Sequence, residues 1–236
     1  MYQPGLFSSY DSAPLPLHAP DGFFSLPVAV AGYVVSGAVV ALAARLAGRR
    51  LQERTVPLMG VMAAFVFAAQ MLNFPIAGGT SGHLIGGALL AVLLGPWAAV
   101  LVMTAVVGLQ ALIFQDGGLV VLGVNVFNMG VLTTLGGYAA YRGVRVVLGS
   151  GRRGLLVGGF AAAWLSVVAA AVAAAFELSL SGTSPLMVAL PAMAGVHALI
   201  GLAEGAITVA ALSFILSVRR DLLGLPMMRS REVANG

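Results

Sequence analysis

The sequence lacks cysteine and lysine, and only 8% of its 236 residues are charged. Without cysteine the chain forms no disulfide and offers no thiolate to a metal ion. Without lysine it cannot contain the GxxxxGK[ST] loop that binds phosphates in many ATPases. Water-soluble domains carry about a quarter charged residues, whereas 60% of this chain is hydrophobic. The composition excludes a soluble domain and predicts an all-α, polytopic membrane protein.

All twelve basic residues are arginines, and they form three clusters beside long apolar runs. The clusters are Arg45, Arg49, Arg50 and Arg54; Arg142, Arg145, Arg152 and Arg153; and Arg219, Arg220, Arg229 and Arg231. Arginine-rich segments next to membrane spans are retained in the cytoplasm, so the three clusters mark one side of the bilayer. Orientation therefore accounts for the net charge of +4, and no nucleic-acid partner is expected.

The apolar runs predict a bundle of seven transmembrane helices. The predicted spans are residues 27–46, 57–73, 83–95, 97–114, 119–141, 154–176 and 191–218. The break between the third and fourth spans rests on Pro96, which has no amide proton to continue a helix. Four spans then separate the first two arginine clusters, which places both on the same side. The same count predicts an external amino terminus and a cytoplasmic carboxyl terminus.

The predicted spans divide the chain into three parts. Residues 1–26 form an extracytoplasmic arm without a cleavable secretory signal, residues 27–218 form the seven-helix domain, and residues 219–236 form a basic cytoplasmic tail.

Polar side chains gather at the predicted outer ends of the spans, where they are costly in lipid and therefore face a cavity or a partner. They are His18, Gln70, Asn73, His83, Gln115, Asp116, Asn125, Asn128 and His197. Asn125 and Asn128 are three residues apart and share a helix face, which favours a joint role. For Gln70, Gln110 and Asn128 taken singly, hydrogen bonding between helices is the favoured alternative. Asp116-Gly117-Gly118 fits a simple turn equally well.

The histidines are the best candidates to bind a metal, because imidazole suits nickel, cobalt, copper and zinc. His18 and His83 are the predicted ligands, and Asp21 either ligates or caps the first helix. His197 and Glu204 are seven residues apart on one helix face, which favours a supporting polar network over direct ligation.

Four segments resemble, in order and spacing, the CbiM/NikM family of cobalt- or nickel-binding membrane subunits, the S components of energy-coupling factor (ECF) transporters. They are HAPDGF (18–23), the run from VPLMG to LLGPW (56–97), FQDGGLVVLGVNVFNMG (114–130) and HALIGLAEGAIT (197–208). The resemblance implies a seven-helix protein of the prokaryotic plasma membrane with an outward-facing site for Co²⁺ or Ni²⁺ and no prosthetic group. It also implies that the chain is not an enzyme.

Within the family, the resemblance implies a square-planar nitrogen site made by a terminal amine, the amide and side chain of the following histidine, and the histidine of a GTSxH segment. These positions match His18 and His83 here, with Ser81 in the GTSGH block and Asn125 and Asn128 orienting the arm. His18 follows sixteen residues and Leu17, so no terminal amine stands beside it. Either translation starts at Leu17, or an amide, Asp21 or water fills that position.

The resemblance also implies partners: a transmembrane coupling subunit, two cytoplasmic ATPases and, optionally, a small accessory membrane subunit. Gly32, Ser36, Gly37 and Ala41 have the spacing of small residues that permits close helix approach and are candidates for the coupling face. Internal packing of the bundle is an equal alternative.

Two other functions stay open at this stage. A stand-alone ion- or proton-coupled carrier would use Glu204 as its titrating group. A rhomboid-like intramembrane serine protease would use Ser81, within Gly79-Thr80-Ser81-Gly82, with His197 as its base.

Overall fold

The computed structural model describes residues 18–48, 55–71, 73–76 and 80–223, and for residues 73–76, 80–82 and Asp221 it describes the backbone alone. Within these residues the chain forms seven helical segments, as predicted. They are α1 (Leu26–Gly48), α2 (Thr55–Gln70), α3 (Gly87–Leu94), α4 (Pro96–Ile113), a continuous helix made of α5 (Leu122–Asn125), η1 (Val126–Gly136) and α6 (Gly137–Leu148), α7 (Arg152–Leu180) and α8 (Leu186–Val218). A short 3₁₀ helix, η2 (Arg220–Leu223), follows α8.

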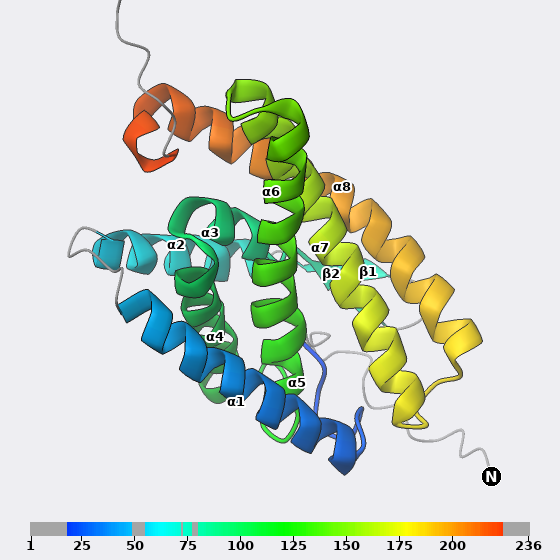
Figure 1. Ribbon diagram of the computed structural model, residues 1–236. Helices are drawn as coiled ribbons and strands as arrows, with labels where there is room; N and C mark the ends of the chain where they lie inside the picture. Colours follow the sequence, from blue (N-terminus) through cyan, green and yellow to red (C-terminus); the bar gives the residue numbers. More distant parts are fainter. Residues whose placement is uncertain (1–17, 49–54, 72, 77–79, 224–236) are drawn as a thin grey trace, which may run out of the picture.

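Four of these helices are long and apolar enough to cross a membrane, namely α1, α4, α7 and α8. Their outer faces carry large apolar side chains, including Val34 at 66% exposure on α1 and Met187 at 86% on α8. Lipid is the environment in which such faces are stable. The core lies where α3, α4, η1 and α7 meet, around Leu90, Met103 and Leu155 (Figure 1).

The predicted break at Pro96 is confirmed. Helix α3 ends at Leu94, Gly95 adopts a φ of 82°, and Pro96 is the first residue of α4. Gly95 suits this sharp change of direction because residues with a side chain rarely adopt positive φ. Helix α3 is short and its first five residues are buried, as expected of a segment sheltered by its neighbours.

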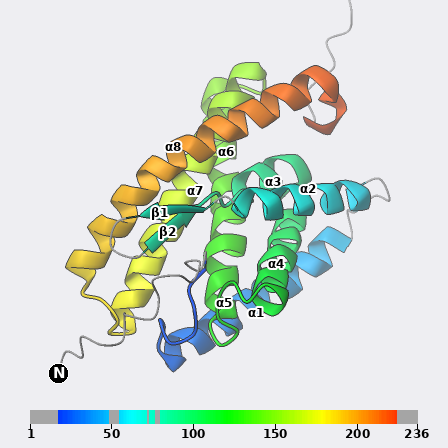
Figure 2. The same ribbon diagram turned by 180° about the vertical axis from the view of Figure 1, so that it is seen from behind.

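The region around His83 differs from the prediction. The second helix ends at Gln70 rather than residue 73, and the third begins at Gly87 rather than residue 83. Between them lies an antiparallel hairpin of β1 (Asn73–Ile76) and β2 (Thr80–His83), in which Asn73 pairs with His83. The described chain is otherwise helical, as predicted, but the placement of His83 is corrected: it ends a strand beside α8 instead of starting a helix (Figure 2).

The segment η1 is an eleven-residue π-helix. Its i→i+5 bonding lets the chain fit more residues into one turn, and such segments occur frequently at functional sites. Asn128 and Met129 lie in its first turn, and Thr133 and Thr134 donate their hydroxyls back to the carbonyls of Met129 and Gly130.

Helix α1 packs closely on α5 through small residues. A Cβ added at Gly32 would lie 2.7 Å from the backbone nitrogen of Val124, and Ser36 donates its hydroxyl to the carbonyl of Gly123 at 2.7 Å. Gly32 is half-buried and Ser36 is buried. These contacts support the alternative of internal packing for these two residues. Gly37 has nothing within 4 Å, and Ala41 is exposed on the opposite side of the helix.

We expect Gly32→Ala to lower the free energy of unfolding by about 1–3 kcal/mol, because the added methyl meets backbone that cannot move aside alone. Gly37→Ala is the matched control on the same helix, and we expect it to raise stability by up to about 1 kcal/mol, because the methyl meets nothing and alanine favours the helix. Thermal unfolding in detergent measures both. Equal midpoints for the two variants would contradict the close packing of α1 on α5.

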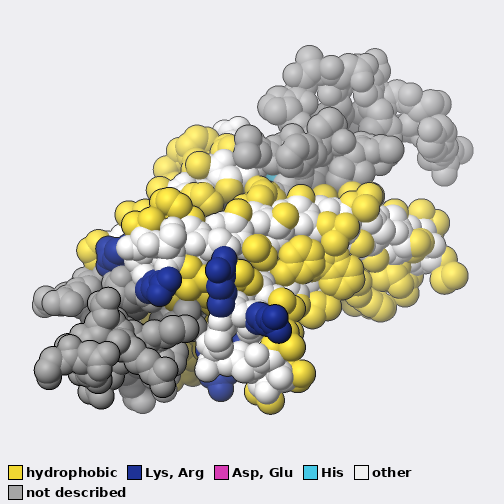
Figure 3. Space-filling view, turned by 90° about the horizontal axis from the view of Figure 1, so that it is seen from above, with side chains coloured by type: hydrophobic (Ala, Val, Ile, Leu, Met, Phe, Trp, Pro, Cys, Tyr) yellow, Lys and Arg dark blue, Asp and Glu magenta, His cyan; other side chains and the backbone are white. Residues whose placement is uncertain are grey.

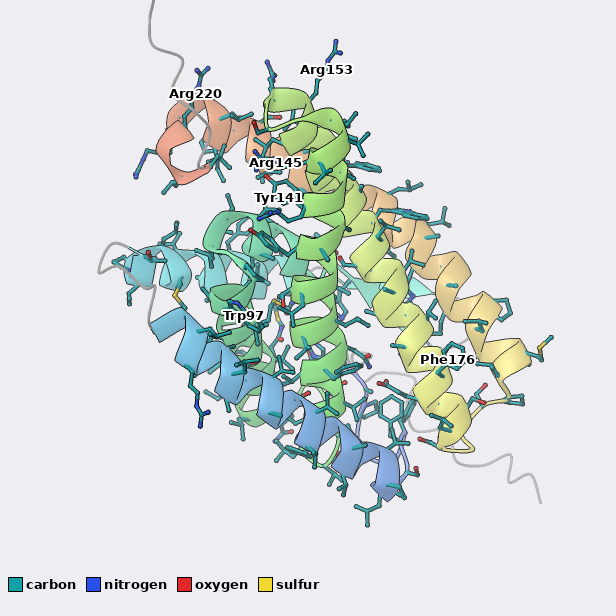
Figure 4. The ribbon with its side chains drawn as sticks, in the orientation of Figure 1. Trp97, Tyr141, Arg145, Arg153, Phe176 and Arg220 are labelled. Atoms are coloured by element: carbon teal, nitrogen blue, oxygen red, sulfur yellow. The ribbon has the colours of Figure 1, made fainter. Side chains whose placement is uncertain are left out.

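Arginines from three helices gather at one end of the bundle, where α6 ends, α7 begins and α8 ends, whereas Arg45 lies in the last turn of α1. Arg142, Arg152, Arg153, Arg219 and Arg220 are exposed there (Figure 3). Arg153 and Arg220 lie at this end and point out of the bundle, whereas Phe176 lies near the other end of α7 (Figure 4). Arg49, Arg50, Arg54, Arg229 and Arg231 lie outside the described residues, as do residues 1–17 of the arm and 224–236 of the tail.

Candidate metal site

The amino-terminal arm crosses the end of the bundle opposite the arginines and is fixed there by hydrogen bonds. The carbonyl of Ala19 accepts from the amide of Gly118 at 2.9 Å and from Nδ2 of Asn125 at 3.0 Å. Oδ1 of Asp21 accepts from the amides of Val120 at 2.8 Å and Val121 at 3.3 Å. Asp21 thus binds the amino-terminal end of α5, and neither predicted role, as a ligand or as the cap of the first helix, describes this contact.

His18 is buried against the turn that follows α4. Its amide donates to Oδ1 of Asp116 at 3.3 Å, and its Nδ1 lies 3.3 Å from the Asp116 carbonyl and 3.4 Å from Oδ2. The turn passes so close that a Cβ on Gly117 would lie 2.8 Å from Cβ of His18. Asp116-Gly117-Gly118 is therefore both a turn and the support of His18.

His83 packs directly on His18. The ring centroids are 5.2 Å apart with the planes at 70°, although 65 positions separate the two residues in the sequence. Nδ1 of His83 lies 2.9 Å from the carbonyl of Leu84. Carbonyl oxygens only accept, so Nδ1 carries the proton in both rings and the lone pair is on Nε2. Nε2 of His18 is buried and makes no hydrogen bond within the described part of the chain.

The turn after His83 is held by two buried side chains. Glu204 on α8 accepts from the amide of Ile85 through Oε2 at 2.7 Å and from the amide of Gly86 through Oε1 at 2.9 Å. Gln70 at the end of α2 donates through Nε2 to the carbonyl of Ile85 at 2.7 Å. Both side chains are at most 2% exposed. Gln70 and Glu204 thus fix the backbone that positions His83.

A cavity of about 210 Å³ opens beside the two imidazoles. Asn125 and Asn128 line it from α5 and η1, and His197 lines it from α8, so all three histidines share it. Nδ2 of Asn128 donates to Oε2 of Glu177 on α7 at 2.6 Å. The Nδ1–H of His197 donates to the carbonyl of Met193 at 2.8 Å. His197 and Glu204 therefore have separate hydrogen-bond partners.

Sequence reasoning missed Glu177 as a partner of the site. The sixth span was predicted to end at residue 176, but α7 runs to Leu180, so Glu177 lies within a helix and points at Asn128. The predicted supporting roles of Asn73 and Ser81 stay predictions, because their side chains lie outside what the structure describes.

Comparison with known proteins identifies the family. The model of the CbiM family, described as the cobalt uptake substrate-specific transmembrane region, matches residues 18–222. A putative fused nickel transport protein, NikMN, of Archaeoglobus fulgidus is 41% identical over 88% of this chain and 68% of its own length. The cobalt transport protein CbiM of Sorangium cellulosum is 37% identical over 78% of this chain and 84% of its own.

A crystal structure of a transition metal transporter aligns with a TM-score of 0.78 and 33% identity, over 85% of this chain and 93% of that one. The match of the family model covers most of the chain, and the fold and the sequences of the relatives agree with it. The chain therefore belongs to the CbiM family and is a membrane protein of cobalt or nickel transport.

Proposed function

We propose that this protein is the substrate-binding membrane component of an ECF transporter for Ni²⁺ or Co²⁺, and that it captures the ion between His18 and His83. The observation that carries the proposal is the contact of these two rings. Two imidazoles that share one ion through bonds of about 2 Å have ring centroids roughly 5–6 Å apart, and the observed separation is 5.2 Å.

The hydrogen bonds around both rings support metal binding. Metal-bound histidines usually donate their other ring nitrogen to a carboxylate or a carbonyl, which fixes the tautomer and the orientation of the ring. Here Nδ1 of His18 faces Asp116, and Nδ1 of His83 faces the carbonyl of Leu84. The amide of His18 is a donor to Asp116, so the two Nε2 atoms are the protein nitrogens offered to the ion, and water completes its coordination.

The proposed site faces the outside of a prokaryotic plasma membrane. The arginines at the opposite end of the bundle support this orientation, because they are retained on the cytoplasmic side. The protein hydrolyses no ATP itself in this proposal. A transmembrane coupling subunit and two cytoplasmic ATPases supply the energy, and Gly37 and Ala41 on the exposed face of α1 remain candidates for contact with the coupling subunit.

Calorimetry and vesicle uptake together test the proposal. We expect at least one tightly bound equivalent of Ni²⁺ or Co²⁺ and no binding of Mg²⁺, because imidazole is a poor ligand for a hard cation. We expect uptake into vesicles only when the coupling subunit, the ATPases and ATP are present. Uptake by this chain alone would instead establish a stand-alone carrier, and absence of tight binding would refute the metal site.

A further inference from the structure

The cavity contains more metal-binding chemistry than the His18–His83 pair uses. His197 lines it from α8, and the thioether side chain of Met193 lines it from the preceding turn of the same helix. The hydrogen bond from Nδ1 of His197 to the carbonyl of Met193 leaves the lone pair of His197 on Nε2. The tautomer is thus the same as that of His18 and His83.

His197 does not complete the first site. Among the described residues, no three His, Cys, Asp or Glu side chains lie close enough together to hold one metal ion. The cavity, at about 210 Å³, is also much larger than one ion needs, since about 10–15 Å³ is enough to hold one water molecule. The cavity therefore has room for an ion at each of two places.

We propose that His197 and Met193 form a second position for the transported ion, which accepts Ni²⁺ or Co²⁺ through one imidazole nitrogen and one thioether sulfur. This proposal rests on the proposed function, because it assigns a further step to the same ion. Imidazole and thioether are ligands that first-row transition ions accept and that Mg²⁺ and Ca²⁺ avoid. An ion that leaves His18 and His83 would meet new ligands without leaving the cavity.

The chain offers a matched control in Met129. It also lines the cavity, but from η1 on the other wall. Substitution of either methionine by leucine keeps the volume nearly constant, so both variants are expected to fold. Only Met193 shares a helix turn with His197, and so only Met193 should contribute the sulfur.

The test is X-ray absorption at the nickel edge on the full chain in detergent, with one and with two equivalents of Ni²⁺. We expect nitrogen and oxygen scatterers alone at one equivalent, and an added sulfur scatterer at two. Met193→Leu should remove the sulfur signal and Met129→Leu should keep it. Calorimetry on His197→Gln should show loss of the second equivalent while the first equivalent is retained, since the two positions share no ligand.

Several results would overturn the second position. They are a single equivalent in the wild type, two equivalents without sulfur, and a sulfur signal that follows Met129 instead of Met193. Retention of two equivalents in His197→Gln would do the same. Each of these leaves the first site standing, whereas a protein that binds no nickel at all refutes the proposed function and the second position together.

Discussion

His83→Ala is expected to weaken the binding of the first Ni²⁺ or Co²⁺ by at least about 100-fold. Loss of a group that merely supports a metal ligand already costs about 10–100-fold, and His83 is proposed to contact the ion itself. His18→Ala should have an effect of the same size, because the two rings contribute one nitrogen each. Calorimetry on the purified variants measures both losses directly.

A general loss of structure would also lower affinity, so the comparison needs a histidine variant in the same cavity. His197→Gln serves this purpose, since His197 lines the cavity without belonging to the pair. We expect it to retain the first equivalent with near wild-type affinity. Full affinity in both His18→Ala and His83→Ala would remove the basis of the proposed site.

The sequence predicted that polar residues from distant segments gather at one place. His18, His83, Asn125 and Asn128 come from distant segments, and the structure brings all four to one cavity. This convergence was predictable because polar residues are conspicuous in a chain that is 60% hydrophobic, and because their cost in lipid drives them towards a shared interior. The break at Pro96 was predictable for an equally local reason, the missing amide proton.

The local backbone at the site was not predictable from the same signals. The hairpin from Asn73 to His83 lies between two apolar helices, and hydrophobicity alone does not separate a short strand from a helix end. The π-helix η1 also has no signature in a 3.6-residue pattern, although its register points Asn128 towards Glu177. Met193 was not predicted as a ligand, because methionine is common in apolar helices and its presence there does not indicate a metal site.

The partners of Glu204 could not be read from the sequence either. Its spacing from His197 suggested one network, but the structure gives the two residues separate partners on one helix face. Glu204 holds the turn after His83 through the backbone of Ile85 and Gly86, two residues that carry no polar side chain. Hydrogen bonds to backbone amides leave no trace in the residue types they involve.

Glu204→Gln is expected to lower both the stability of the protein and its affinity for the metal, because these two hydrogen bonds need both carboxylate oxygens. Each oxygen of the carboxylate accepts one amide proton, from Ile85 and from Gly86. Glutamine has one acceptor oxygen, and its NH₂ group would face the other amide, donor against donor. One buried amide would lose its partner, which costs about 1–3 kcal/mol. Because this turn positions His83, we expect metal affinity to fall by about 10–100-fold as well.

Glu177→Gln is the matched control, since it makes the same substitution at another carboxylate beside the cavity. Nδ2 of Asn128 donates to one oxygen of Glu177, and glutamine retains an oxygen at that place. We therefore expect a loss of less than about 1 kcal/mol in stability. Thermal unfolding and calorimetry on both variants measure the difference. Equal losses at the two positions would contradict a special role for the two hydrogen bonds from Ile85 and Gly86 to Glu204. His83 would then be held in place by other contacts.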